Sequence, residues 1–307
     1  MKNVYLFPGQ GSQSVGMLAG LDTLNEYIEQ AWQAASDVVG QDVARLVAEG
    51  PEATLNQTAT TQPVLLAASY ALWQAAQAEG KPVPDAVAGH SLGEYSALVA
   101  AGVLGFEDAL KLVRQRGQLM QAAVPEGEGA MAAVLGLDDE VVEQVCLEVE
   151  AQVGEVVAAA NYNCPGQVVI AGTAAAVSKA GEALKSAGAR RVMPLAVSVP
   201  SHCMLMKPAA EQLAESLRTV RFAAPKVPVV QNTVGIPVSD PEAIRANLLE
   251  QLYRPVRWSQ SMRYLLEQGA DTFYECGPGK VLAGLLKKID RQAAVVTLSD
   301  QKEWNQA

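Results

Sequence analysis

The stretch DAVAGHSLGE, residues 85–94, joins a short apolar run to an apolar helical pattern that begins at Leu92. Between them lies Gly-x-Ser-x-Gly, a sequence typical of the sharp turn by which a strand enters a helix and lifts a serine oxygen clear of a sheet. A glycine-rich structural turn with an ordinary helix-capping serine has the same pattern. The flanking strand and helix favour the first interpretation, with Ser91 as the candidate nucleophile.

Each residue of this turn has a physical reason to be there. Ser91 is expected in strained backbone geometry, and Gly89 and Gly93 omit the side chains that would collide across so tight a turn. The N–H of Leu92 opens the following helix and faces the space above Ser91, where negative charge can be stabilised. The turn therefore predicts a nucleophile with an oxyanion-binding donor beside it.

The composition favours a globular α/β protein and argues against several other classes. The chain has 307 residues, of which 50% are apolar and 18% charged, so it can form one large domain with an insertion, or two domains. A net charge of −10 argues against nucleic-acid binding. No apolar run approaches the roughly 18 residues of a membrane span, and no secretory signal is apparent. The four scattered cysteines favour reduced thiols, so we expect a cytoplasmic protein without a metal site.

The helix predicted over residues 106–122 carries an arginine in an unusual place. At 100° per residue, Ala109, Val113 and Met120 share an apolar face, and Arg116 projects from its middle. An inward guanidinium is costly unless it meets an anion. A buried ion pair or a side chain that reaches out to water is one explanation. A substrate carboxylate is the other, because arginine can bind it with two parallel hydrogen bonds.

The order of predicted elements indicates an inserted subdomain. Residues 126–198 follow the order strand, helix, strand, strand, helix, strand, which is the ferredoxin-like pattern. Within it, residues 161–167 are predicted to form a turn and residues 189–197 a strand. In the surrounding sequence, a helix is predicted to begin at Thr61-Gln62-Pro63 and to continue to Ala78.

The catalytic base is selected by elimination. A serine hydroxyl needs an adjacent base, and the chain has only two histidines. His90 neighbours Ser91 in the turn, so its side chain leaves the backbone in another direction. His202 follows an apolar strand far along the chain, which fits the Ser-then-His order of α/β-hydrolase-type sites. No aspartate stands out as a third member, and a backbone carbonyl can orient the imidazole instead.

Four motifs together resemble one family. They are FPGQGSQ at residues 7–13, GHSLGE at 89–94, Arg116-Gly117, and GPG at 277–279. In this order and at these separations they resemble the malonyl-CoA:acyl carrier protein transacylases of bacterial fatty-acid synthesis, over essentially the whole chain. The resemblance implies an α/β fold with an α/β-hydrolase-like core, residues 1–125 and 199–307, and a ferredoxin-like subdomain, residues 126–198. It also implies a monomer.

The resemblance further implies a role for each site residue. Ser91 would attack the thioester of malonyl-CoA, His202 would take its proton, and the N–H groups of Leu92 and Gln10 would hold the oxyanion. Arg116 corresponds to the malonate clamp. Gln251 would lie beside the histidine, whose ring a main-chain carbonyl holds. Acyl carrier protein would then receive the malonyl group on its phosphopantetheine thiol, and no resident cofactor is implied beyond malonyl-CoA and CoA as substrate and product.

Other functions stay open at this stage. Many relatives have Phe before the catalytic histidine, whereas this chain has Ser201, which in polyketide acyltransferases accompanies methylmalonyl selection. A polyketide-associated acyltransferase that tolerates methylmalonyl-CoA is one alternative, an α/β-hydrolase-type thioesterase is a second, and a non-catalytic carrier-binding module is a third. The basic candidates for docking an anionic carrier are Lys280, Lys287, Lys288, Arg291, Arg190 and Arg191.

Overall fold

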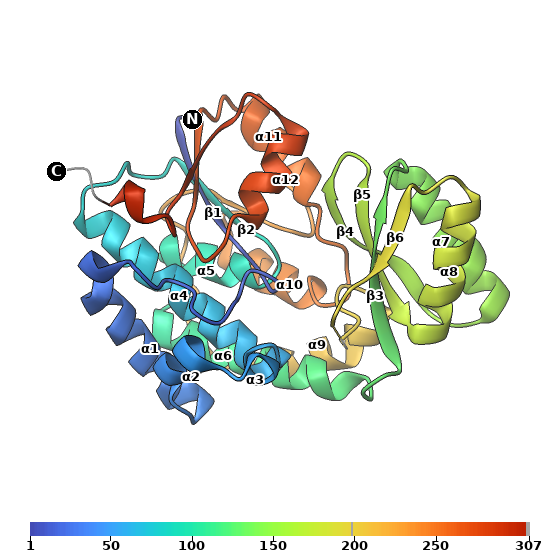
Figure 1. Cartoon of the computed structure of the whole chain (residues 1–307), viewed down its shortest axis with the longest axis horizontal. Coiled ribbons are helices and arrows are strands. Elements are labelled where there is room, and N and C mark those ends of the chain that lie inside the picture. Colours follow the sequence, from blue (N-terminus) through green and yellow to red (C-terminus); the bar gives the residue numbers. More distant parts are fainter. Residues whose placement is uncertain (198, 305–307) are drawn as a thin grey trace.

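A parallel sheet forms the centre of the larger part of the molecule. The computed structural model describes residues 1–197 and 199–304, and Figure 1 shows their arrangement. The sheet has the order β7-β2-β1-β8-β9, and all its pairings are parallel. Its strands are β1 (Asn3–Phe7), β2 (Ala86–Gly89), β7 (Val229–Val230), β8 (Thr272–Glu275) and β9 (Ala294–Thr297). Phe7 pairs with Gly89, so the loops that follow β1 and β2 leave the sheet side by side.

Helices cover both faces of this sheet because its strands are apolar on both sides. Tyr5 and Phe7 pack into the larger hydrophobic cluster, and Val4 and Leu6 into a second cluster on the opposite face. The first face carries α1 (Asn25–Val39), α2 (Val43–Glu49), α3 (Glu52–Leu55), α4 (Thr58–Ala78), α5 (Leu92–Ala100), α6 (Phe106–Ala123), α9 (Lys207–Thr219) and α10 (Pro241–Glu250). The second carries α11 (Trp258–Glu267) and α12 (Val281–Ile289).

A smaller antiparallel sheet stands beside the larger one, at the right of Figure 1. Its strands are β3 (Gly129–Leu135), β4 (Val157–Cys164), β5 (Gln167–Thr173) and β6 (Arg191–Pro194), in the order β4-β5-β3-β6. Helices α7 (Asp139–Val153) and α8 (Ala174–Ser186) pack on it through a separate hydrophobic cluster. This order is the ferredoxin-like arrangement, so the predicted fold class is confirmed. The domain limits stay a prediction, and residues 198 and 305–307 lie outside the described residues.

The prediction that a helix begins at Thr61 was wrong, because Pro63 lies inside that helix and is accommodated by a contact with a second helix. Helix α4 begins at Thr58, and Pro63 lies inside it. Proline has no N–H, so the carbonyl of Ala59, one turn earlier, lacks its helical donor. The guanidinium of Arg114 on α6 supplies a donor instead, with 2.7 Å between its Nη1 and the Ala59 oxygen. The proline is therefore tolerated through a contact that the local sequence does not reveal.

The predicted turn at residues 161–167 was also wrong. Strand β4 continues to Cys164, and only Pro165 and Gly166 separate it from β5. The pairing shifts between Ala159 and Asn161 and again before Cys164, which are β-bulge irregularities that re-aim side chains. The strand predicted over residues 189–197 is shorter, because β6 spans only Arg191–Pro194.

Helices α4 and α6 lie in direct contact next to the arginine singled out above. A Cβ added to Gly117 would lie 2.7 Å from the Cα of Ala59, which is too close for any side chain. Glycine is therefore needed at this position to let the two backbones meet.

Within the part of the chain that the structure describes, no helix is both long and apolar enough to cross a membrane.

Candidate active site

Ser91 lies at the sharp turn between β2 and α5. Its backbone has φ +52° and ψ −109°, a strained conformation for a residue with a side chain. A Cβ on Gly89 would lie 1.8 Å from the Gly93 oxygen, and a Cβ on Gly93 would lie 2.0 Å from the Phe7 oxygen. The strain and the close approach that the sequence predicts are both confirmed.

His202 lies within proton-transfer reach of this serine. Its Nε2 is 2.8 Å from the Ser91 Oγ, and its Nδ1 is 2.6 Å from the main-chain oxygen of Gln251. Because a carbonyl only accepts, Nδ1 must carry the proton, and the Nε2 lone pair then faces the hydroxyl. Burial, together with the nearby charge of Arg116, lowers the pKa of His202 to about 3. The imidazole is therefore a neutral base at neutral pH.

Arg116 is fully buried beside the same serine, with only 1% of its surface exposed. Its Nη1 donates to Gln62 Oε1 at 2.8 Å, its Nη2 donates to Gln251 Oε1 at 2.9 Å, and Nη2 lies 3.4 Å from the Ser91 Oγ. Burial lowers the pKa of the guanidinium, but an arginine side chain keeps its proton in proteins.

The partners of Arg116 leave its positive charge without a matching anion. Within the described residues it forms no salt bridge, and its buried Nε has no hydrogen-bond partner. Of the two explanations, the geometry therefore favours an anion that arrives from outside the chain. Such an anion would meet N–H donors of Arg116, whose Nη2 lies 3.4 Å from the Ser91 oxygen.

Two amide side chains hold the strained turn in place. Asn232 accepts the Ser91 N–H at 2.7 Å through Oδ1, and its Nδ2 donates to the Gly89 oxygen at 2.7 Å. Gln251 Nε2 donates to the Ser91 carbonyl oxygen at 3.0 Å.

Sequence reasoning did not assign a role to Asn232, Gln62 or the buried acid Glu94. Asn232 has one available signal, because it follows a strand of a parallel sheet at the edge where such sites form.

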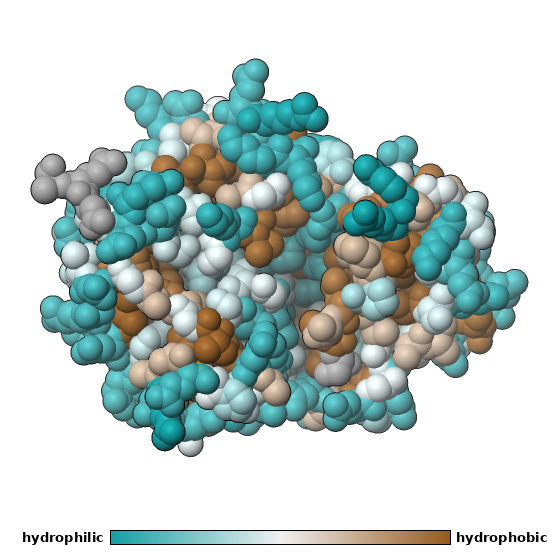
Figure 2. All heavy atoms as spheres, viewed as in Figure 1, coloured by the Kyte–Doolittle hydropathy of each residue, from teal (hydrophilic) through white to brown (hydrophobic). Residues whose placement is uncertain are grey.

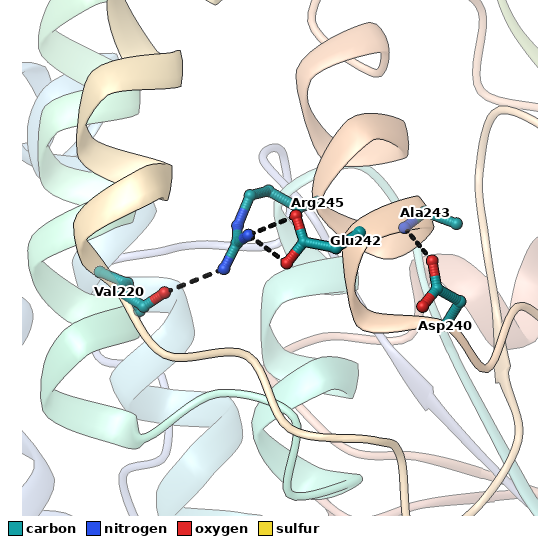
Figure 3. Close-up of polar contacts among 5 residues, drawn as sticks. All are labelled: Val220, Asp240, Glu242, Ala243 and Arg245. Carbon is teal, nitrogen blue, oxygen red and sulfur yellow. Dashed lines mark hydrogen bonds and ion pairs between the residues drawn. The ribbon is translucent and has the colours of Figure 1, made fainter.

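Helix α10 delivers Gln251 to the site, and Figure 3 shows how the start of this helix is fixed. Asp240 caps its first turn. Arg245 pairs with Glu242, with Nη1 2.6 Å from Oε2, and donates to the Val220 oxygen at 3.2 Å, which ties α10 to the end of α9. Gln251 is the residue that directly follows the helix, so both its carbonyl and its amide are placed by this anchoring.

Ser91 and Arg116 open onto a cavity of about 110 Å³. One side comes from the larger part of the molecule, including Gln10 and Leu92, and the other from the apolar residues Met131 and Leu195 beside the small sheet. Figure 2 shows the surface hollowed between these two parts. The size suits a small acyl group.

The predicted oxyanion donors meet at this cavity. Gln10 and Leu92 both line it, and within the described residues neither N–H donates to another group. A Cβ on Gly9 would lie 2.3 Å from the His90 oxygen, so the loop after β1 touches the serine turn. The His90 ring points away and pairs with Asn163 on β4, 2.8 Å from Nε2 to Oδ1. The geometry thus brings all six predicted site residues around one small space: Gln10, Ser91, Leu92, Arg116, His202 and Gln251.

Comparisons with known proteins identify the family of this chain. A family model described as an acyl transferase domain matches residues 4–301. The chain belongs to the acyl transferase family. This acyl transferase is 53% identical over 285 residues to the malonyl CoA-acyl carrier protein transacylase of Salmonella typhimurium, which covers 93% of the chain and 92% of the relative. It is 50% identical over 305 residues to the enzyme of that name from Haemophilus influenzae, over 99% and 97% of the two chains.

A solved structure extends this likeness to the fold. The acyl transferase matches a malonyl-transacylase in complex with a type II PKS acyl-carrier protein, with a TM-score of 0.95 and 51% identity. The match covers 98% of this chain and 96% of that one. The mixed α/β fold predicted from the sequence is therefore the fold of the family, and the protein is an enzyme that transfers acyl groups.

Proposed function

We propose that this acyl transferase moves a malonyl group from malonyl-CoA to the phosphopantetheine thiol of an acyl carrier protein in fatty-acid synthesis. One observation carries the proposal: a buried guanidinium whose described partners are two neutral amides lies 3.4 Å from the oxygen of a serine paired with a histidine. An acyl group that ends in a carboxylate supplies the missing anion. The names of the relatives support the same substrate and partner.

The first half of the cycle forms a malonyl ester. As the Ser91 oxygen attacks the thioester carbon, its proton passes to Nε2 of His202, 2.8 Å away. The carbonyl oxygen gains negative charge and is held by the N–H groups of Leu92 and Gln10. The carbon–sulfur bond then breaks, and the imidazolium returns the proton to the sulfur, so that CoA leaves as a thiol.

The second half reverses the order with a new thiol. The phosphopantetheine thiol gives its proton to His202 and attacks the ester carbon, and the ester bond to Ser91 breaks as the proton returns to the serine oxygen. The cycle consists of proton transfers and acyl transfer only, so we propose that it uses no resident cofactor. The Gln251 carbonyl keeps the imidazole in one tautomer throughout.

The carboxylate clamp separates this function from its alternatives. A general thioesterase has no use for a buried cation beside the nucleophile, whereas a malonyl donor pairs with Arg116 in both halves of the cycle. Ser201 lines the cavity, which leaves space for an extra methyl group. One methyl alters discrimination by only about 1–3 kcal/mol, so we propose malonyl as the principal substrate with measurable use of methylmalonyl.

Basic surface residues provide the docking site that we propose for the anionic carrier. All six candidates are exposed: Arg190, Arg191, Lys280, Lys287, Lys288 and Arg291. Lys288 donates to Gln167 Oε1 at 2.9 Å, so it joins α12 to the start of β5. We also propose that the protein acts as a monomer in the cytoplasm, where its four free cysteines would stay reduced.

Intact-protein mass spectrometry tests the function. After brief exposure to a mixture of malonyl-CoA, methylmalonyl-CoA and acetyl-CoA, the wild type should carry mainly one malonyl group. Ser91→Ala should carry none. Ser201→Ala, a serine variant in the same cavity, should still be malonylated. Acyl carrier protein bearing phosphopantetheine should remove the group much faster than water does. Loss to water at the same rate would identify a thioesterase instead.

A further inference from the structure

A buried carboxyl group beside the site has no part in the cycle described above. Glu94 lies on the first turn of α5, and only 1% of its surface is exposed. Its Oε2 accepts from Gln251 Nε2 at 2.6 Å and from the Asn232 N–H at 3.4 Å, and within the described residues its Oε1 has no partner. Burying such a group is costly, so its presence requires an explanation.

Burial makes the Glu94 carboxyl harder to ionise than an exposed one. Burial raises the pKa of Glu94 to about 8, against the hydrogen bonds from Gln251 and Asn232, which lower it. A neutral acid does not cancel the positive charge of Arg116. It still offers an acceptor oxygen to the Gln251 amide, and that oxygen makes the shortest contact of the amide nitrogen.

The Gln251 amide has two unlike ends, and its orientation decides what Arg116 meets. As observed, Nε2 faces acceptors on Glu94 and Ser91, and Oε1 faces the Arg116 Nη2 at 2.9 Å. A flipped amide would set oxygen against the Ser91 carbonyl oxygen, which only accepts, and N–H against N–H at Arg116, which only donates. The hydrogen bond from Nε2 to the Glu94 oxygen adds to this preference and holds the amide with its oxygen toward the guanidinium.

We propose that Glu94 is a positioning residue, whose carboxyl fixes the Gln251 amide and thereby aims the Arg116 guanidinium at the substrate carboxylate. The inference rests on the proposed function, because an aimed cation matters only for an acyl group with a free carboxylate. Glu94 itself touches neither the substrate nor the His202 ring. Its influence passes through Gln251, whose side chain hydrogen-bonds to both Glu94 and Arg116.

Two substitutions separate this role from a structural one. Glu94→Gln keeps an acceptor oxygen in nearly the same shape and should leave the KM for malonyl-CoA within about 3-fold of wild type. Glu94→Met has a similar size but no acceptor and should raise this KM by about 10- to 100-fold, the range for a buried hydrogen bond lost. Reaction of Ser91 with phenylmethylsulfonyl fluoride, a neutral reagent that does not need the clamp, should change by less than about 2-fold.

A second buried acid serves as the control. Glu275 accepts the N–H groups of Leu282 and Ala283 at the start of α12, away from the cavity. Glu275→Gln should lower thermal stability without altering the KM for malonyl-CoA. If Glu94→Met does not fold, Glu94→Asp, which withdraws the acceptor by one methylene group, should raise the KM in its place.

The results that overturn the proposal are specific. An unchanged KM in Glu94→Met or in Glu94→Asp excludes the positioning role. Equal slowing of malonylation and of the sulfonyl fluoride reaction shows that Glu94 merely supports the fold of the turn. A wild-type protein that takes no malonyl group from malonyl-CoA would refute the proposed function itself, which the Glu94 variants do not test.

Discussion

Replacing Arg116 by alanine should convert a malonyl-selective site into an unselective one. The guanidinium is buried with 1% exposure, so water does not readily take its place. A hydrogen bond to a charged group contributes about 1.5–3 kcal/mol, and a carboxylate on the guanidinium fork makes two. We therefore expect a loss of roughly 3–6 kcal/mol in transition-state binding, or about 150- to 25,000-fold in kcat/KM for malonyl-CoA.

The assay compares two acyl donors on the same variant. Rapid quenching followed by mass measurement gives the rates at which malonyl-CoA and acetyl-CoA acylate Ser91. Arg116→Ala should slow malonylation and spare or improve acetylation, since acetyl has no carboxylate to bind. Arg116→Lys keeps a charge without the two-pronged fork and should fall between wild type and alanine.

Arg114 provides the matched control on the same helix. Its guanidinium donates to the Ala59 oxygen rather than lining the cavity, so Arg114→Ala should cost stability and leave the ratio of malonyl to acetyl transfer unchanged. Equal losses with both donors in Arg116→Ala would refute the clamp, because they would show that the arginine acts on the serine turn or on the fold and not on the carboxylate.

Three further predictions test the base, the turn and the docking surface. The pKa of His202 is lowered to about 3, and the neutral ring is the base, so the acylation rate should stay constant from pH 7 to pH 5. The rate should fall only as the pH nears about 3. A decline centred near about pH 6.5, the ordinary pKa of histidine, would contradict the lowered pKa. Gly93→Ala should abolish the acyl-enzyme and lower the melting temperature, because the added Cβ would lie 2.0 Å from the carbonyl oxygen of Phe7 on β1. Gly284→Ala is the control: a Cβ there would meet nothing within 4 Å, so the substitution should be neutral or stabilise the fold by about 1 kcal/mol. Reversing Lys287 and Lys288 to glutamate should slow transfer to acyl carrier protein at low salt and much less at high salt; kinetics and salt dependence like those of wild type would remove them from the docking surface.

The parts of the site that sequence could predict are those with a local signature. The serine turn is visible because glycines must flank it, and Arg116 because helical periodicity places it on an apolar face. His202 was found by elimination among two histidines. Each of these inferences needs only a short segment or a count, and the fold class follows from the same elements in order.

The supporting polar network could not be predicted in this way. Gln251 was named only through the family resemblance, Asn232 was not named, and Glu94 was quoted as part of a motif without a role. These residues are far apart in the chain and meet only after folding, as the hydrogen bond between Gln251 and Glu94 shows. The asparagines of β4 misled the prediction for the same reason: Asn163 favours turns in local sequence, yet in the fold it faces His90.

The contact between α4 and α6 limits how this enzyme can acquire new substrates. Gly117 packs against the Ala59 backbone and Arg114 donates to the Ala59 oxygen, so two contacts hold the helix that carries Arg116 against α4. Changes of substrate, by evolution or by design, are therefore expected to leave the α6 side of the cavity in place. Room for bulkier acyl chains would have to come from the facing side of the cavity, at side chains such as Met131 and Leu195.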